Sequence, residues 1–304
     1  MDEISTDMPD VVKYVNAIIF CASIIMFLIV FPFYVYVFKM NRKQDQETLL
    51  FPAVNHFYQM TRNVFFLCIA MIFFACLSLL ERFSGLFKLL PLILMYIIYI
   101  ITQIFSFLTF LLSFQRFILY FISSSEPYIV QIQKQAPKYI WALYLVFIIK
   151  DIFIFVFIFV DAKEESNGFK TIYIVIFFTF NIFSILSAIL HVPMYFSVRK
   201  LSNLVSVKRS TPQRFILWQA ITVLIFKFMF IVLVLTCLWG SLDVMIMLVS
   251  TTGLDIFSTP LIVELSYIGC NKRNMKTLFT GFSFRKFIRV LFDIEENVHV
   301  EQRF

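Results

Sequence analysis

The amino-acid sequence predicts an all-α membrane protein in which seven transmembrane helices form a bundle. Of its 304 residues, 61% are hydrophobic and only 15% are charged, whereas soluble domains are about 25% charged. Seven apolar segments each reach the roughly 18 residues that a helix needs to cross a bilayer. Lysine and arginine are concentrated in alternate loops, which is typical of a multi-pass membrane protein.

The seven segments follow one another with short polar links between them. We expect crossings over residues 15–38, 63–80, 89–121, 139–160, 171–196, 215–239 and 244–269. The fourth carries the adjacent charges Lys150 and Asp151 at its centre, but each half alone is too short to span, so we treat it as one crossing. The polar stretch before residue 63, with Pro52, and residues 123–138 are assigned as links.

Beyond the seventh crossing, residues 276–292 are predicted to form a short amphipathic helix. Its apolar and basic residues alternate at helical spacing: Phe284, Phe287, Ile288 and Leu291 among Arg285, Lys286 and Arg289. A basic amphipathic helix of this kind suits a membrane surface.

The distribution of lysine and arginine sets the orientation. One set of loops holds most of them, and the opposite set holds only Lys13, Arg82, Lys88, Lys163 and Lys170. Because the basic side faces the cytoplasm, residues 1–14 are expected to be a short extracellular N-terminus, 15–269 the seven-transmembrane domain and 270–304 a cytoplasmic tail. The net charge of +7 then fits an anionic inner leaflet as partner, and nucleic acid is not expected.

The third segment carries a thin polar line on an otherwise apolar helix. Thr102, Thr109, Ser113 and Arg116 fall within one narrow sector at 3.6 residues per turn, with Ser106 at its edge. Arginine is costly deep in hydrocarbon, so Arg116 is expected at a membrane surface. The line predicts a face turned into the bundle. The alternative is an interfacial arginine and hydroxyls bonded to their own backbone.

Several stretches resemble a known receptor family. They are FPFYVYVFKMNRK at 31–43, FPAVNHFYQM at 51–60, SFQRF at 113–117, FIIKD at 147–151, RKLSNLVS at 199–206 and SYIGCNKRN at 266–274. Together they are most similar to the nematode serpentine chemoreceptors of class Z, which are G-protein-coupled receptors. The resemblance implies a plasma-membrane receptor on sensory neurons, with a small-molecule ligand, a heterotrimeric G protein as partner and no cofactor.

Resemblance to the broader rhodopsin-like pattern marks candidate coupling residues. Gln115-Arg116 resembles the acidic-Arg motif that closes helix three, with glutamine replacing the acidic residue. Pro260 resembles the proline of the Asn-Pro motif in helix seven, and Tyr267 lies one turn beyond the position of that motif's tyrosine. Basic candidates for the docking surface are Lys200, Lys208 and Arg209. Cys270 is a candidate for palmitoylation, with an unmodified thiol as the alternative.

The ligand is expected in the outer half of the bundle, at polar residues set in apolar helices. The candidates are Thr102, Asn181, Ser184, Lys227 and Asp255. Asn181 and Ser184 share a face of the fifth segment, with interhelical hydrogen bonding as the alternative role. Lys227 and Asp255 lie near the midplane of neighbouring helices, which predicts an ion pair at the pocket floor. The alternative is that water or backbone carbonyls meet each charge separately.

Three further charges fall inside crossings. Lys150 and Asp151 are adjacent, hence about 100° apart on a helix, so we expect them not to face one partner and interpret them as structural. Glu264 lies on the side of the seventh helix opposite to Asp255. It is the weaker candidate for a pair, unless a kink at Pro260 rotates it.

Other function classes find little support. The sequence has no HExxH, no glycine-rich phosphate loop and no nucleophile paired with histidine by a recognisable motif, so an enzyme is not expected. Its three histidines are too scattered for a metal site. A multi-pass transporter or channel is kept as the alternative. It would predict an internal repeat or paired broken helices, and neither is visible.

Overall fold

The computed structural model describes residues 4–46, 51–78, 86–122, 126–161, 168–200, 218, 221–225, 228, 244–269, 272–280 and 282–291. Every element within these ranges is an α-helix. The helices are α1 (Ile4–Gln46), α2 (Phe51–Ser78), α3 (Leu86–Phe121), α4 (Glu126–Asp161), α5 (Gly168–Lys200), α7 (Val244–Gly269), α8 (Lys272–Phe279) and α9 (Phe284–Leu291). The all-α prediction is confirmed, and the predicted seventh crossing matches α7 at both ends.

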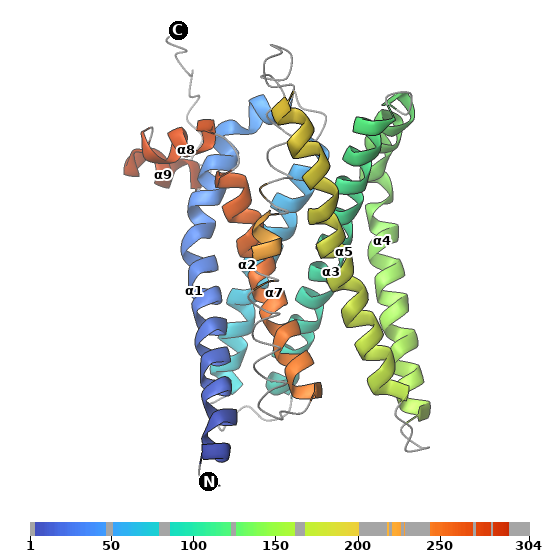
Figure 1. Ribbon diagram of the computed structural model, residues 1–304. Helices are drawn as coiled ribbons and strands as arrows, with labels where there is room; N and C mark the ends of the chain where they lie inside the picture. Colours follow the sequence, from blue (N-terminus) through green and yellow to red (C-terminus); the bar gives the residue numbers. More distant parts are fainter. Residues whose placement is uncertain are drawn as a thin grey trace.

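The long helices stand side by side as one bundle (Figure 1). α1, α3, α5 and α7 run in one direction, and α2 and α4 run in the other. α5 ends and α7 begins at opposite ends of the bundle. The residues described between them, 218, 221–225 and 228, are helical and fall inside the predicted sixth crossing. α8 and α9 lie beside α1, at the end of the bundle where α1 finishes.

The helices have the length and surface that a bilayer requires. Among the described residues, three segments are long and apolar enough to cross a membrane: Ala17–Gln46, Phe51–Ser78 and Leu89–Leu119. α5 contributes a shorter apolar stretch, Ile174–Leu190. Large apolar side chains point outward from the bundle, for example Phe66 and Phe73 on α2 and Phe153 on α4. Such a surface is far more apolar than water favours, and lipid solvates it.

Aromatic contacts hold α1 against α2 and α7. Phe38 of α1 stacks on Tyr58 of α2, with 3.9 Å between ring centroids. Tyr267 of α7 approaches Phe38 to 5.7 Å. Elsewhere along the same pair of helices, Phe20 meets Phe257 edge-on at 4.7 Å. Ring pairs at these distances add to the burial of apolar area, which explains why α1 packs so extensively against α7.

Two segments assigned as links are helical instead. α2 begins at Phe51 and α4 at Glu126, so nearly all of both stretches belongs to helices. Pro52 and Pro127 occupy the first turns, where proline costs no intrahelical hydrogen bond. The prediction was wrong because hydropathy marks only the part of a helix that lies in hydrocarbon. Polar turns that project beyond it give no such signal.

The predicted amphipathic helix over residues 276–292 is two helices, α8 and α9, separated at the sequence TGFS, residues 280–283. Glycine is a poor helix former and serine is favoured just before a helix begins, which accounts for the break. Phe287 of α9 packs on Phe33 and Tyr36 of α1, at 5.5 and 5.7 Å between centroids. Lys39 Nζ donates at 3.1 Å to a carbonyl in the last turn of α9. The tail is therefore fastened to α1.

Candidate functional site

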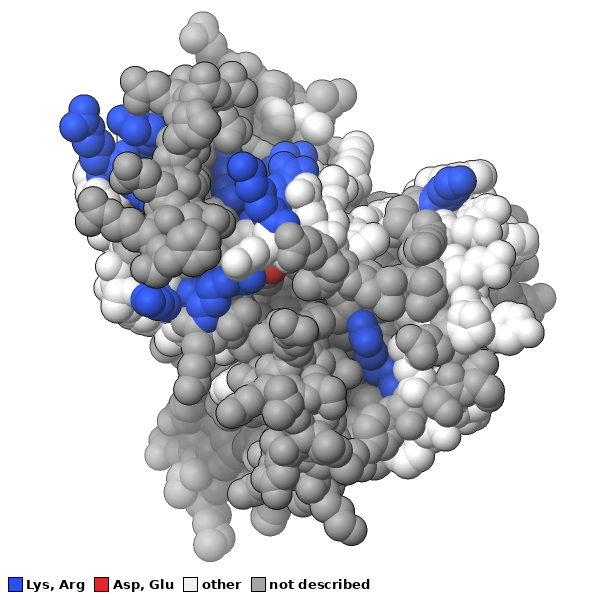
Figure 2. Space-filling view, turned by 90° about the horizontal axis from the view of Figure 1, so that it is seen from above, with Lys and Arg blue, Asp and Glu red and all other residues white. Residues whose placement is uncertain are grey.

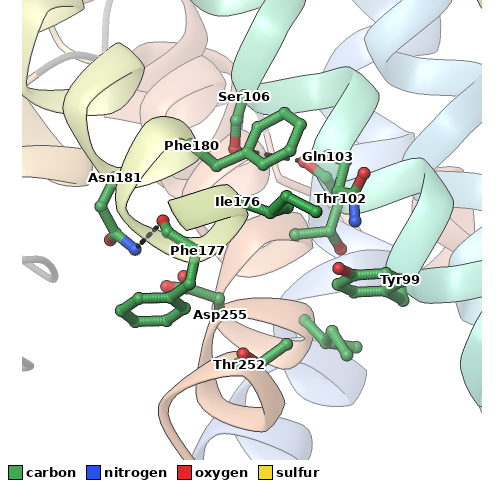
Figure 3. A pocket seen from close by; sticks show the side chains of 11 residues that line it. Tyr99, Thr102, Gln103, Ser106, Ile176, Phe177, Phe180, Asn181, Thr252 and Asp255 are labelled. Carbon is green, nitrogen blue, oxygen red and sulfur yellow. Dashed lines mark hydrogen bonds between the residues drawn. The ribbon is translucent and has the colours of Figure 1, made fainter. Parts of the chain in front are cut away.

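A small cavity lies between α3, α5 and α7 (Figure 3). Its volume is about 40 Å³, far below the roughly 300–1,000 Å³ of a typical ligand pocket. Each helix lines it with residues spaced mostly three or four positions apart, the spacing that puts side chains on one face. The lining residues are Tyr99, Thr102, Gln103 and Ser106 of α3, Ile176, Phe177, Phe180 and Asn181 of α5, and Thr252, Asp255 and Ile256 of α7.

The structure brings three of the five candidate ligand-binding residues together in this cavity. They are Thr102, Asn181 and Asp255. Ser184 lines a neighbouring cavity of about 20 Å³, which shares Asp255 with the first. Lys227 lies outside the described residues. Ligand binding by these side chains stays a prediction, but most of them are placed where one molecule can reach them.

Polar groups in the wall are partly satisfied by their own helices. Thr102 Oγ1 donates to the carbonyl of Ile98 at 3.0 Å. Ser106 Oγ donates to the carbonyl of Thr102 at 3.2 Å. Asn181 Nδ2 donates to the carbonyl of Phe177 at 2.8 Å. A hydroxyl oxygen and an amide oxygen keep their capacity to accept, so these groups can still receive hydrogen bonds from a ligand.

Gln103 differs from these residues because its side chain bonds to another helix rather than to its own backbone. Its side chain is 4% exposed, and its Oε1 accepts a hydrogen bond from Lys150 Nζ of α4 at 2.5 Å. Because lysine can only donate, this contact fixes which end of the amide carries the oxygen. The remaining Nε2 is buried and has no hydrogen-bond partner. Gln103 lines the cavity, so an unsatisfied N–H donor lies beside it, on a residue that sequence analysis did not select.

Lys150 and Asp151 form an ion pair with each other, with 2.7 Å between Lys150 Nζ and Asp151 Oδ1. Tyr96 of α3 donates through its hydroxyl to Asp151 Oδ2 at 3.3 Å. The expectation that the two charges face different partners was wrong, because the long lysine side chain bends toward α3 as well. Lys150 Nζ also lies 5.3 Å from the ring centroid of Phe180 on α5. α4 is thereby connected to two residues of the cavity wall.

The polar line of α3 faces the bundle, as predicted. Thr102, Thr109 and Ser113 are all buried. Ser113 Oγ donates to the carbonyl of Thr109 at 2.8 Å and lies 2.6 Å from Ser187 Oγ of α5. Either hydroxyl can be the donor in the contact between the two helices. The hydroxyls therefore bond their own backbone, and one of them also joins two helices.

Arg116 lies one turn beyond Ser113, toward the end of the bundle where α8 and α9 lie. The side chain is partly buried, and its Nε is buried without a hydrogen-bond partner. Gln115 lines a different cavity, between α2, α3 and α4. A simple interfacial anchor would extend its whole guanidinium into the headgroups, whereas here part of the group stays inside the protein.

Tyr267 joins the end of α7 to α1 and α8. Its hydroxyl donates to Asp45 Oδ2 of α1 at 2.5 Å, and Arg273 of α8 pairs with the other carboxylate oxygen of Asp45. Asn274 Nδ2 donates to the Tyr267 carbonyl at 2.6 Å. Pro260 is buried within α7, two turns earlier. The candidate activation tyrosine is thus held in a polar contact among three helices.

Glu264 is completely buried, and neither of its carboxylate oxygens has a hydrogen-bond partner. Polar residues elsewhere on α7 are also buried: Thr251, Ser258, Thr259 and Ser266. α7 is therefore enclosed on both sides. Residues on both faces of the helix are buried, so the choice between Asp255 and Glu264 as the partner of Lys227 stays a prediction.

The remaining candidates receive no structural account. Lys200 is the last residue of α5, and its side chain lies outside the described part of the chain; Lys208, Arg209 and Cys270 lie outside it entirely. Figure 2 views the end of the bundle that carries α8 and α9, where lysine and arginine far outnumber visible acidic side chains. Exposed basic residues of α1, α8 and α9 are Arg42, Lys43, Lys276, Arg285 and Lys286.

Long apolar helices of alternating direction, an outward apolar surface and two short helices after the last crossing define a multi-pass membrane protein of the seven-helix receptor class. The family described as serpentine type 7TM GPCR chemoreceptor Srz matches residues 17–272, and the chain belongs to that family. The resemblance to serpentine receptor class Z is confirmed. No curated protein and no solved structure matches the chain.

Proposed function

We propose that this chemoreceptor binds a small molecule in the cavity between α3, α5 and α7. The observation that carries the proposal is the buried Nε2 of Gln103, which has no partner. A buried donor left unsatisfied costs about 1–3 kcal/mol, and a ligand acceptor placed there would remove that cost. Together with Asp255 and the wall hydroxyls, the donor favours a small polar ligand with at least one hydrogen-bond acceptor.

The narrowness of the cavity supports a mechanism by population shift. At about 40 Å³, it has no room for an organic ligand, so the bound state has to be wider between α3, α5 and α7. A ligand that fits only the wider state shifts the equilibrium toward it. The Ser113–Ser187 contact lies between this cavity and Arg116 and links α3 to α5. Rearrangement at the cavity would therefore alter the helix interface next to Arg116.

We place the G-protein contact at the end of the bundle that holds Arg116, α8 and α9. Lysine and arginine concentrate at this end, which favours its placement on the cytoplasmic side of the membrane. The N-terminus, at the opposite end, would then be extracellular. An outward swing of the sixth helix would open this face to a heterotrimeric G protein, and the two sites would be reciprocally coupled. We also propose that the protein is displayed on the plasma membrane of sensory neurons and acts as a receptor rather than an enzyme. Membership of the chemoreceptor family supports both statements.

A screen tests the function directly. Small volatile and secreted metabolites are applied to cells that express the chain at the surface, and second-messenger levels are recorded. We expect at least one compound with a hydrogen-bond acceptor to produce a response that is absent from cells lacking the chain. Transport or an ionic current that persists when G-protein coupling is blocked would favour the transporter or channel alternative instead.

We also expect Lys227 and Asp255 to form an ion pair at the floor of the cavity. Each isolated charge would cost roughly 2.5–3.5 kcal/mol at the centre of a crossing, and mutual pairing is the simplest remedy. Lys227→Met and Asp255→Asn should each reduce folding yield or shift basal activity, and the double variant should recover part of the loss. The measurement is a double-mutant cycle on folded receptor. Strictly additive losses would rule out the pair.

A further inference from the structure

A second cavity of about 350 Å³ lies between α2, α3 and α4, and no described residue lines both it and the candidate ligand pocket. Among the residues that the structure describes, eleven apolar residues, two polar ones and no charged one line it. The polar residues are His56 and Gln115. The apolar ones are Pro52, Ala53, Phe57, Leu108, Leu111, Leu112, Phe114, Ile118, Ile129, Ile132 and Ile140. An uncharged wall of this composition selects a neutral, mainly apolar occupant.

The cavity opens toward the bilayer. Three of its lining residues, Leu111, Phe114 and Ile132, are 40%, 44% and 65% exposed, so its rim lies on the outer surface of the bundle. Gln115 adjoins Arg116 near the end of α3, and α2 and α4 both begin at that end. The opening is therefore at the depth of one leaflet, and a molecule dissolved in lipid reaches it without crossing water.

Water does not fill such a space. An apolar cavity of roughly 150 Å³ already stays dry and takes up apolar molecules, and this one is larger. One polar group does reach the wall unsatisfied: His56 Nε2 is buried and has no hydrogen-bond partner. The ring of His56 is set edge-on against Tyr144 of α4, with 6.2 Å between centroids, which fixes its place. The occupant is thus apolar, with one group that hydrogen-bonds to His56.

We propose that this cavity binds a rigid, neutral lipid alcohol of the sterol class, with its hydroxyl on His56 Nε2 and its ring system against the apolar side chains of α3 and α4. A hydroxyl both donates and accepts, so it satisfies Nε2 in either histidine tautomer. A rigid ring system loses less conformational freedom on binding than a flexible chain. Fatty acids and phospholipid headgroups carry charges that none of the described lining residues balances.

Photolabelling of the purified full-length receptor in lipid nanodiscs tests the proposal. The probe is a diazirine analogue of cholesterol, and labelled peptides are identified by mass spectrometry. We expect saturable labelling within residues 51–57, 108–118 or 129–140 that excess cholesterol suppresses. Ala53→Phe fills the cavity and should abolish this labelling. Ala75→Phe, the same exchange at an exposed position of the same helix, should leave it unchanged.

The hydrogen bond is tested by His56→Phe, which keeps an aromatic ring but removes the nitrogen. Affinity for cholesterol should fall roughly fivefold, the loss of one hydrogen bond. Cholestene, which lacks the hydroxyl and so neither donates nor accepts, should compete less well than cholesterol on the wild type and equally well on His56→Phe. If His56→Phe does not fold, the comparison of photolabelling between Ala53→Phe and Ala75→Phe tests the proposal instead. Labelling that is unsaturable, unaffected by Ala53→Phe, or suppressed equally by octadecanol would overturn the proposal.

Discussion

Replacing Arg116 with alanine is expected to abolish or deregulate G-protein signalling while leaving surface expression and ligand binding largely intact. Arg116 ends the buried polar line of α3, and part of its guanidinium is enclosed without a hydrogen-bond partner. The side chain is therefore held at the mouth of the bundle, where we propose that it meets the G protein or stabilises the inactive state. Basal and ligand-stimulated second-messenger levels at matched surface expression measure the effect.

Arg62→Ala is the matched control for this experiment. Arg62 is an exposed arginine of α2. The same exchange therefore removes a positive charge from the surface without removing a side chain that is partly buried in the bundle. We expect this variant to signal normally. A well-expressed Arg116→Ala receptor with wild-type signalling would reduce Arg116 to an interfacial anchor.

Lys150→Met is expected to lower the yield of folded receptor severely. Asp151 would then lose its ionic partner within a crossing, where an isolated charge costs roughly 2.5–3.5 kcal/mol. When both charges are removed, no unpaired charge remains at this position of the crossing. Lys150→Met combined with Asp151→Asn should therefore recover most of the yield. Thermal stability of purified receptor and the fraction that is monodisperse on gel filtration are the measurements.

Lys138→Met serves as the control, since Lys138 is an exposed lysine of the same helix, and its yield should match the wild type. The combined Lys150 and Asp151 variant should nevertheless respond to ligand at higher concentrations only, because it no longer holds the Gln103 amide. If the single and combined variants lose the same yield of folded receptor, Lys150 does not stabilise the protein through its ion pair with Asp151.

Much of the fold is predictable because lipid imposes a simple requirement on sequence. α7 is flanked by the polar sequences GSLD at 240–243 and CNKRN at 270–274, so its bounds at Val244 and Gly269 follow from this change in hydropathy. The starts of α2 and α4 do not follow from it, since proline and polar residues are interspersed in the stretches that precede the most apolar parts of both helices. The break between α8 and α9 could not be predicted either, because the amphipathic pattern continues across it and therefore predicts a single helix.

The site is predictable in part for a related reason. Thr102, Asn181 and Asp255 stand out as polar residues in apolar helices, and the helix period brings them to one cavity. Gln103 is also a polar residue in an apolar helix. Its importance, however, depends on its contact with Lys150, which lies on another helix. Contacts between helices are absent from local patterns, so the orientation of the Gln103 amide could only be found in the structure.

The central claim is that the Gln103 N–H donor belongs to a ligand site, and one measurement tests it most directly. Gln103→Glu keeps the oxygen that receives Lys150 but replaces the donor with an acceptor. The concentration of an activating compound that gives a half-maximal response should rise about tenfold or more, the loss of a hydrogen bond to a buried donor. Gln131→Glu, at an exposed position of α4, should leave it unchanged. An unaltered dose–response curve for a normally expressed Gln103→Glu receptor would contradict the account.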